Sequence, residues 1–117
     1  EDVVPRFMFP ADRADKAKEA WRPGKDGILE GKVQVYNFSR EVLKGSLRVA
    51  GGSGLAAEPA EAPVRVGPEG LESVDVRLRW EGAGDPVRRV KAFVVPDGSP
   101  PETSARSSAA VARVIGQ

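Results

Sequence analysis

The stretch Leu71-Glu72-Ser73-Val74-Asp75-Val76-Arg77-Leu78-Arg79-Trp80 alternates apolar and polar side chains more regularly than any other part of the chain. Successive side chains of a β-strand point to opposite faces of the sheet. The order therefore predicts a strand over 71–80 with one buried and one wet face. The inward set is Val74, Val76, Leu78 and Trp80, and the outward set is Ser73, Asp75, Arg77 and Arg79.

Two earlier segments repeat this pattern. Residues 27–37 place Leu29, Gly31, Val33 and Val35 on one face, and residues 42–50 do the same with Gly45, Leu47 and Val49. The residues between them, 37–41, include Asn37 and Ser39, which favour turns. The pattern predicts that the two strands form a hairpin. Asn37-Phe38-Ser39 also matches the N-glycosylation pattern, but we interpret Asn37 as a turn former whose amide binds local backbone groups.

The rest of the chain divides into shorter pieces. Residues 3–9 indicate an edge strand that tolerates Pro5, residues 64–66 and 87–95 indicate two more strands, and 109–115 fits either a last strand or a short helix. Residues 51–63 hold too much Gly and Pro for regular structure and are interpreted as a loop that crosses between sheets. Residues 10–24 fit one or two helical turns or an ordered loop.

These elements favour an all-β fold. Sixteen Val and two Ile against six Leu is a balance typical of strands. Seven or eight short strands separated by turns predict a two-sheet antiparallel sandwich of the immunoglobulin type, with a short helical or irregular insertion near residues 11–22. The 117 residues fit one domain, 1–117, large enough to be stable as a monomer.

Composition excludes several kinds of chemistry. The chain has no His and no Cys, which removes Ser-His-Asp catalysis, thiol nucleophiles and the usual zinc ligands. Eighteen basic and seventeen acidic residues interleave, so we expect no nucleic-acid partner. No apolar run reaches the ~20 residues of a membrane helix. The chain begins at Glu1 without an initiator Met or signal pattern, which indicates a piece of a larger protein.

Residues 27–80 carry a resemblance to a known family. The segment Glu30-Gly31-Lys32-Val33-Gln34-Val35-Tyr36-Asn37, the returning Gly45-Ser46-Leu47-Arg48-Val49 and the later Val64-Arg65-Val66-Gly67-Pro68 and Val74-Asp75-Val76 resemble bacterial Ig-like modules of secreted glycoside hydrolases and surface proteins. The resemblance implies an accessory domain without catalytic residues, located outside the cell or in the periplasm. The segment 10–24 is longer than the connection expected there.

Three aromatic residues are candidates for stacking on a sugar ring. Trp80 continues an inward series and is interpreted as core. Tyr36 lies at a strand end, where it is either a cap of the sandwich or a binding residue, and Trp21 is either a loop anchor or a ligand platform. We therefore take Trp21 and Tyr36 as the candidate ligand-binding residues.

Charged clusters give two further candidates. Asp12, Asp15 and Glu19 lie close enough in sequence to suggest a metal site, but the interleaved Arg13, Lys16 and Lys18 favour a neutralised surface, so no metal or other cofactor is expected. The arginines form a possible contact patch on two strands, which consists of Arg77, Arg79, Arg88 and Arg89.

Three functions follow in order of preference. The first is a non-catalytic module that spaces, buttresses or targets neighbouring domains of the same exported bacterial polypeptide. The second is a carbohydrate-binding module for polysaccharide that uses Trp21, Tyr36 and the loop 51–63. The third is an enzyme that relies on carboxylates, Lys or Ser, which would need a concave pocket with two convergent acids.

Overall fold

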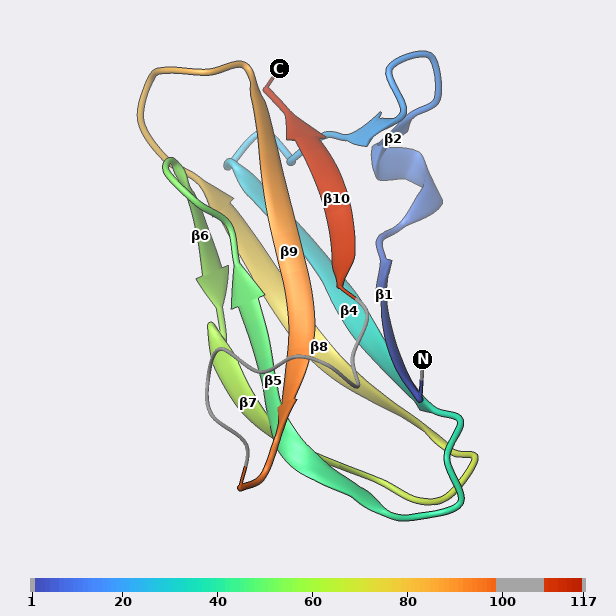
Figure 1. Ribbon diagram of the computed structural model, residues 1–117. Coiled ribbons are helices and arrows are strands. Elements are labelled where there is room, and N and C mark those ends of the chain that lie inside the picture. Colours follow the sequence, from blue (N-terminus) through green and yellow to red (C-terminus); the bar gives the residue numbers. More distant parts are fainter. Residues whose placement is uncertain (1, 99–108, 117) are drawn as a thin grey trace.

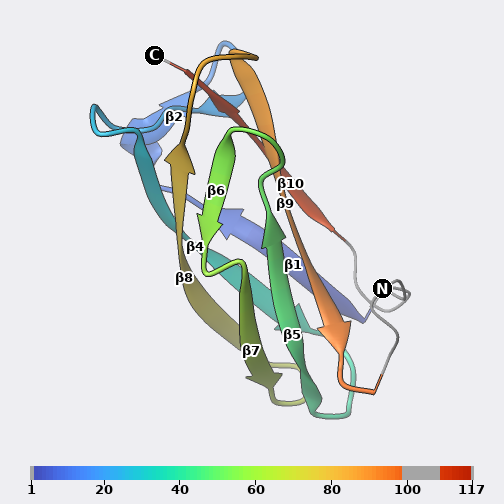
Figure 2. The same cartoon turned by 90° about the vertical axis from the view of Figure 1, so that its left-hand side faces the viewer.

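The computed structural model describes residues 2–98 and 109–116, and in these two ranges the chain forms two β-sheets packed face to face. Figures 1 and 2 show the sheets as two layers whose strands run along the long axis of the molecule. The expected all-β sandwich is confirmed. The turn and polar stretch expected after Pro96 lie largely outside the described residues.

The first sheet has four strands in the order β1-β4-β8-β6, all antiparallel. Its centre is the pair of ten-residue strands β4 and β8, aligned from Ile28 opposite Arg79 to Tyr36 opposite Leu71. The bounds are β1 Val3–Met8, β4 Ile28–Asn37, β6 Leu55–Glu58 and β8 Leu71–Trp80.

The second sheet has six strands in the order β2-β3-β10-β9-β5-β7. Its neighbours are antiparallel except β3 and β10, which are parallel, so the expectation of a strictly antiparallel fold is wrong at this one pair. The bounds are β2 Ala14–Asp15, β3 Ala20–Trp21, β5 Leu43–Ala50, β7 Glu61–Val66, β9 Val87–Pro96 and β10 Ala110–Ile115.

The core lies between the sheets and consists of the side chains that the two-residue periodicity places inward. Leu29, Val33, Leu47, Leu78 and Val94 are almost completely removed from solvent. Trp80 is half-buried and packs against the same cluster, as its position in the alternation predicts. Burying a Val or Leu side chain contributes about 1.5 to 3 kcal/mol, so this alternation supplies the main driving force for folding.

The predicted hairpin between residues 27–37 and 42–50 is wrong, because β4 and β5 belong to different sheets. The five residues 38–42 carry the chain from the four-stranded sheet to the six-stranded sheet. Asn37 fixes it: the buried side-chain amide donates hydrogen bonds to the carbonyls of Glu41, Val66 and Gly67, and its oxygen accepts from Ser39. Asn37 is thus the turn former that was expected, and its burial leaves no room for a glycan.

Residues 51–63 cross between the sheets as expected, but they are not a loop throughout. The chain leaves β5 in the six-stranded sheet, adds β6 to the four-stranded sheet and returns as β7 to the six-stranded sheet. Leu55 is buried in β6, whereas Ala56 and Ala57 are too small to produce the strong alternation that marks a strand. A strand of four residues at a sheet edge leaves little trace in the sequence.

The structure decides between the alternatives for residues 10–24 and 109–115. Residues 10–24 form a single 3₁₀ turn, η1 Ala11–Arg13, followed by the two-residue strands β2 and β3. Residues 110–115 form the strand β10, which lies between β3 and β9. The insertion therefore extends the six-stranded sheet. Among the described residues, no helix has the length and apolar character needed to cross a bilayer.

Two of the four sheet edges carry a proline. Pro5 lies in β1, the edge of the four-stranded sheet, and Pro63 lies in β7, the edge of the six-stranded sheet. Proline has no N–H to donate, so a strand from another chain could not complete its hydrogen bonds there. The opposite edges are β6 and β2, which are only four and two residues long. These four outermost strands are poor templates for a further strand, whereas Leu71–Val76 of β8 extends beyond the end of β6.

Gly31 tests the packing of β1 on β4. A Cβ atom at this position would lie 2.6 Å from the carbonyl oxygen of Met8 and would collide with the Phe9 ring. We predict that Gly31→Ala lowers the free energy of unfolding by about 1 to 3 kcal/mol. The control is Gly67→Ala, where nothing lies within 4 Å of the added atom. Urea denaturation measures both, and an equal loss of stability would contradict the packing described.

Candidate functional site

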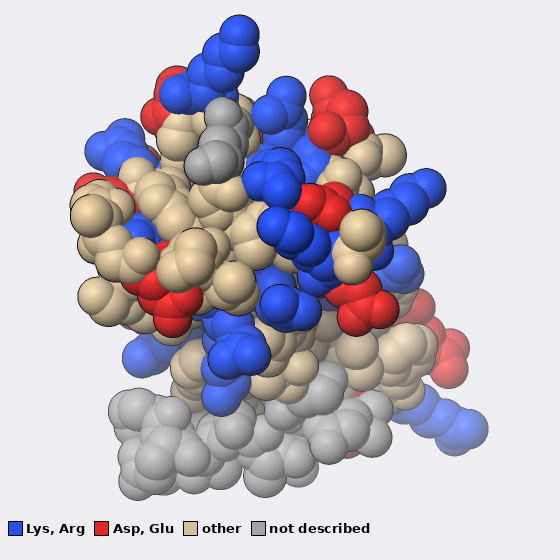
Figure 3. Space-filling model, turned by 90° about the horizontal axis from the view of Figure 1, so that it is seen from above, with Lys and Arg blue, Asp and Glu red and all other residues tan. Residues whose placement is uncertain are grey.

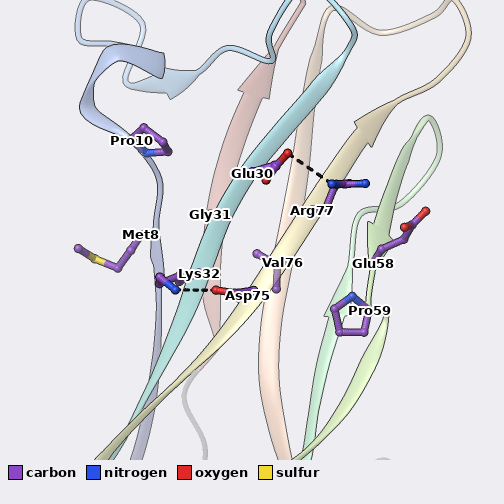
Figure 4. A pocket seen from close by; sticks show the side chains of 10 residues that line it. All are labelled: Met8, Pro10, Glu30, Gly31, Lys32, Glu58, Pro59, Asp75, Val76 and Arg77. Atoms are coloured by element: carbon purple, nitrogen blue, oxygen red, sulfur yellow. Dashed lines mark hydrogen bonds and ion pairs between the residues drawn. The ribbon is translucent and has the colours of Figure 1, made fainter.

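The outer face of the four-stranded sheet carries a hollow lined by charged side chains (Figure 4). Met8 and Pro10 border it on one side and Glu58 and Pro59 on the other, with β4 and β8 as its floor. Two ion pairs in the hollow join β4 to β8, each between residues that lie directly opposite one another. Lys32 Nζ lies 2.6 Å from Asp75 Oδ1, and Arg77 Nη2 lies 3.5 Å from Glu30 Oε1.

The carboxylates of the hollow are compensated by cations. Asp75 faces Lys32, Glu30 faces Arg77, and Glu58 lies 3.8 Å from Arg79 Nη2. All these side chains are well exposed, so each pair contributes little to stability. The arrangement differs from that of an acid and base catalyst, which needs two carboxyl groups that converge on one substrate atom. The hollow is a neutralised surface rather than a candidate reaction centre.

The four candidate arginines do not form one patch. Arg77 and Arg79 lie on the outer face of the four-stranded sheet and have acidic neighbours. Arg89 lies on β9 of the six-stranded sheet and is exposed. Arg88, its neighbour in sequence, is buried. Figure 3 shows the molecule from above the view of Figure 1, and on this end Lys and Arg side chains lie among Asp and Glu side chains.

Arg88 binds backbone carbonyls instead of a partner's carboxylate. Its guanidinium donates hydrogen bonds to the carbonyl oxygens of Gly54 and Glu81 at 2.5 and 2.7 Å, and further bonds to those of Asp85 and Gly82. The guanidinium carbon lies 3.9 Å from the centre of a Trp80 ring, a cation–π contact. Arg88 thus ties the β5–β6 turn to the β8–β9 loop and covers the edge of the core.

Trp21 and Tyr36 lie at opposite ends of β1. Trp21 is half-buried, packs against the core and has its ring 5.2 Å from that of Phe9, which follows β1. Tyr36 pairs with Val4 near the start of β1 and faces the outside of the four-stranded sheet. The structure therefore does not unite the two into one platform. Whether either residue binds a ligand stays a prediction.

Phe38, which lies in the predicted turn 37–41, is the residue that accompanies Tyr36. The two rings are parallel within 3°, with centres 5.9 Å apart, and Phe38 is 60% exposed. The sequence carried a signal for this pair, because residues two apart in an extended chain point to the same side. Phe38 follows the last residue of β4, and the turn-forming residues Asn37 and Ser39 on either side of it hide this signal.

The acidic cluster of residues 12–19 contains one strong ion pair. Asp15 Oδ2 accepts hydrogen bonds from Arg22 Nη2 at 2.8 Å and Nε at 3.2 Å, and Asp15 Oδ1 accepts one from the amide of Lys18. These bonds, first of all those from the Arg22 side chain, lower the pKa of Asp15 below its ordinary value of 3.8. Within residues 2–98 and 109–116, no group of acidic side chains is arranged to hold a metal ion.

Solved structures similar to this chain show the same fold. The CARDB domain of PF1109 from Pyrococcus furiosus aligns over 98% of this chain and 94% of that one, with a TM-score of 0.66 and 16% identity. A FixG-related protein from Vibrio parahaemolyticus aligns over 100% and 98%, with a TM-score of 0.66 and 10% identity. These are Ig-like sandwiches, and at such identities the likeness concerns the fold alone.

A third similar structure is part of a much longer protein. Alpha-2-macroglobulin of E. coli aligns with 99% of this chain at a TM-score of 0.70 and 12% identity, and the match covers 7% of that protein. No protein-family model matches the sequence, and no curated protein matches it. The likeness to bacterial Ig-like modules is thus supported for the fold, whereas nothing in these comparisons connects the chain to glycoside hydrolases.

We predict that Arg88→Ala lowers the free energy of unfolding by about 2 to 4 kcal/mol, because four backbone carbonyls lose a charged donor and the Trp80 ring loses its cover. Guanidinium denaturation measures the loss. The matched control is Arg89→Ala, one residue along the same strand but exposed, which should change stability by less than about 0.5 kcal/mol. Equal effects would mean that the carbonyl contacts of Arg88 are not structural.

We also predict that the stabilising effect of Asp15 depends on pH. Its pKa is lower in the folded than in the unfolded chain, so its contribution is present above the unfolded value and is lost as pH falls through the folded value. The thermal midpoint of Asp15→Asn should lie below that of the parent at about pH 7, and the difference should shrink towards about pH 2. The control is the same comparison in an Arg22→Gln background, where the pH dependence of the difference should be much smaller. A difference that does not change with pH in the parent background would contradict the pairing.

Proposed function

We propose that this chain is a non-catalytic Ig-like module of a larger, exported bacterial polypeptide, and that it holds neighbouring domains of that polypeptide at a set distance. Its partners are then those domains, and in isolation it is a monomer. The proposed location is outside the cell or in the periplasm, which rests on the resemblance carried by residues 27–80.

The single observation that carries the proposal is the placement of the first and last strands. Val3, at the start of β1, pairs with Asn37 at one end of β4. The amide of Gly116, after β10, donates to the carbonyl of Pro86, close to the opposite end of the sheet. Figure 1 shows the two ends of the described chain well separated along the long axis. Domains attached before β1 and after β10 would therefore be joined to opposite ends of the module.

The distance that the module adds follows from strand geometry. β4 holds ten residues and runs between the two ends. At about 3.3 Å per residue the strand spans roughly 30 Å. β4 pairs with β1 on one side and β8 on the other and has the core against one face, which makes this length stiff, unlike a Gly- and Ser-rich linker.

The comparisons and the surface support the same role. The chain aligns with a segment that makes up 7% of alpha-2-macroglobulin, so this architecture occurs as one unit among others in a long polypeptide. The outermost strands of both sheets are short or carry proline, which favours a module that does not pair with copies of itself through them. In the hollow on the four-stranded sheet, the acidic groups face basic ones, which gives no support to acid and base catalysis.

The test removes residues 3–115 from the full gene product and measures its maximum dimension by small-angle X-ray scattering. The dimension should fall by about 30 Å, the span of β4 between the two ends of the module. Insertion of an unrelated sandwich of similar length should restore the dimension, whereas a Gly- and Ser-rich segment should not. An unchanged dimension after deletion would contradict the spacing role.

A further inference from the structure

An aromatic surface lies on the outer face of the four-stranded sheet, at the end where β4 finishes. Tyr36 has Val4 of β1 on one side and Leu71 of β8 on the other, as the strand register requires. Phe38 continues the same side of the chain beyond the strand. Leu71 is 45% exposed and Phe38 is 60% exposed. Large apolar side chains are therefore gathered at one place in contact with water.

The two rings of this surface are held parallel. Their planes differ by 3° and their centres are 5.9 Å apart. The Tyr36 hydroxyl donates a hydrogen bond to Gln34 Oε1 at 3.1 Å, which restrains the ring, and the amide of Phe38 donates to the carbonyl of Asp2, which restrains the backbone. A ligand that stacks on these rings therefore meets a surface already ordered, so less conformational entropy is lost on binding.

Polar side chains form the next row of the same face. Arg6 of β1 is paired with Gln34 of β4, and Gln34 is paired with Ser73 of β8, so all three project to the side of Tyr36. Arg6 forms no ion pair within the described part of the chain. The row offers donors from the guanidinium and both donors and acceptors from the amide and the hydroxyl.

We propose that this surface, made of Tyr36, Phe38 and Leu71 with Arg6, Gln34 and Ser73, binds a pyranose ring of a glycan chain. A pyranose has an apolar C–H face that packs on an aromatic ring and a rim of hydroxyls that both donate and accept hydrogen bonds. The two rows match these two parts of the ligand. The single cation favours a neutral sugar over a polyanion, which would need several.

The chemistry of the polar row decides between a sugar and a peptide. A proline-rich peptide also stacks on aromatic rings, but its prolines carry only carbonyl acceptors and have no N–H to donate. The Ser73 hydroxyl oxygen, and the lone pair of Gln34 Oε1 that the Tyr36 hydroxyl leaves free, would then have no donor to accept from. Trp21 takes no part, because it lies at the other end of β1. Glycan binding at this surface does not require the spacing role. An experiment can therefore contradict one of the two proposals and leave the other standing.

The experiment is affinity electrophoresis of the purified chain in native gels that contain soluble cellulose derivatives, xylan, mannan or β-1,3-glucan. The chain should be retarded in at least one gel. Phe38→Ala should weaken the retardation about tenfold, expressed as a dissociation constant, because one stacked ring is lost. Phe38 is exposed, so its removal should leave the thermal midpoint nearly unchanged, which excludes unfolding as the cause.

The matched control is Phe93→Ala, which removes a half-buried aromatic ring from β9 in the six-stranded sheet. It should bind each polysaccharide as the parent does. No retardation in any of the gels would overturn the proposal, and so would equal weakening by Phe38→Ala and Phe93→Ala. Binding of a fluorescent proline-rich peptide that depends on Phe38, without binding of polysaccharide, would assign the surface to peptides and would also overturn it.

Discussion

The fold depends on the burial of one face of each of four long strands. β4 and β8 in one sheet turn their valines and leucines towards those of β5 and β9 in the other, and this core contains side chains such as Val33, Leu78, Leu47 and Val94 that water does not reach. The opposite faces of β4 and β8 carry charged residues that pair across the strands. A shift of either strand by one residue would expose the apolar set and bury the charged one, so the register is strongly fixed.

Two buried polar side chains close the sandwich, one at each end. Asn37 binds carbonyls where β4 finishes, and Arg88 binds carbonyls where β9 begins. Carbonyls in turns have no strand partner, and leaving them unpaired away from water costs about 1 to 3 kcal/mol each. The Asn37 amide and the Arg88 guanidinium supply donors to these carbonyls in place of water. These bonds hold the loops at both ends of the sandwich in place.

Alternation in the sequence was sufficient to predict the long strands and the inward residues, because burial of one face leaves a period of two. It was not sufficient for strand pairing: the alternation of residues 27–37 and 42–50 is typical of a hairpin, but β4 pairs with β1 and β8 whereas β5 pairs with β7 and β9. Short edge strands such as β6 cannot be predicted in this way, because Ala56 and Ala57 do not alternate between apolar and polar side chains. Asn37 and Arg88 occupy positions in the inward phase of their strands, so a polar residue there was a visible signal for a buried anchor. Phe38 could have been placed beside Tyr36 by the same rule.

The position of β1 and β10 has a mechanical consequence. Both strands run in the same general direction along the long axis (Figure 1), and a tensile load between the two ends of the module would act nearly parallel to them. The hydrogen bonds of an antiparallel pair lie perpendicular to the strands. All the bonds that join β1 to β4, and those that join β10 to β9, would be loaded together in shear instead of breaking one after another. A module loaded in this direction should need a larger force to unfold than one whose strand pairs separate one hydrogen bond at a time.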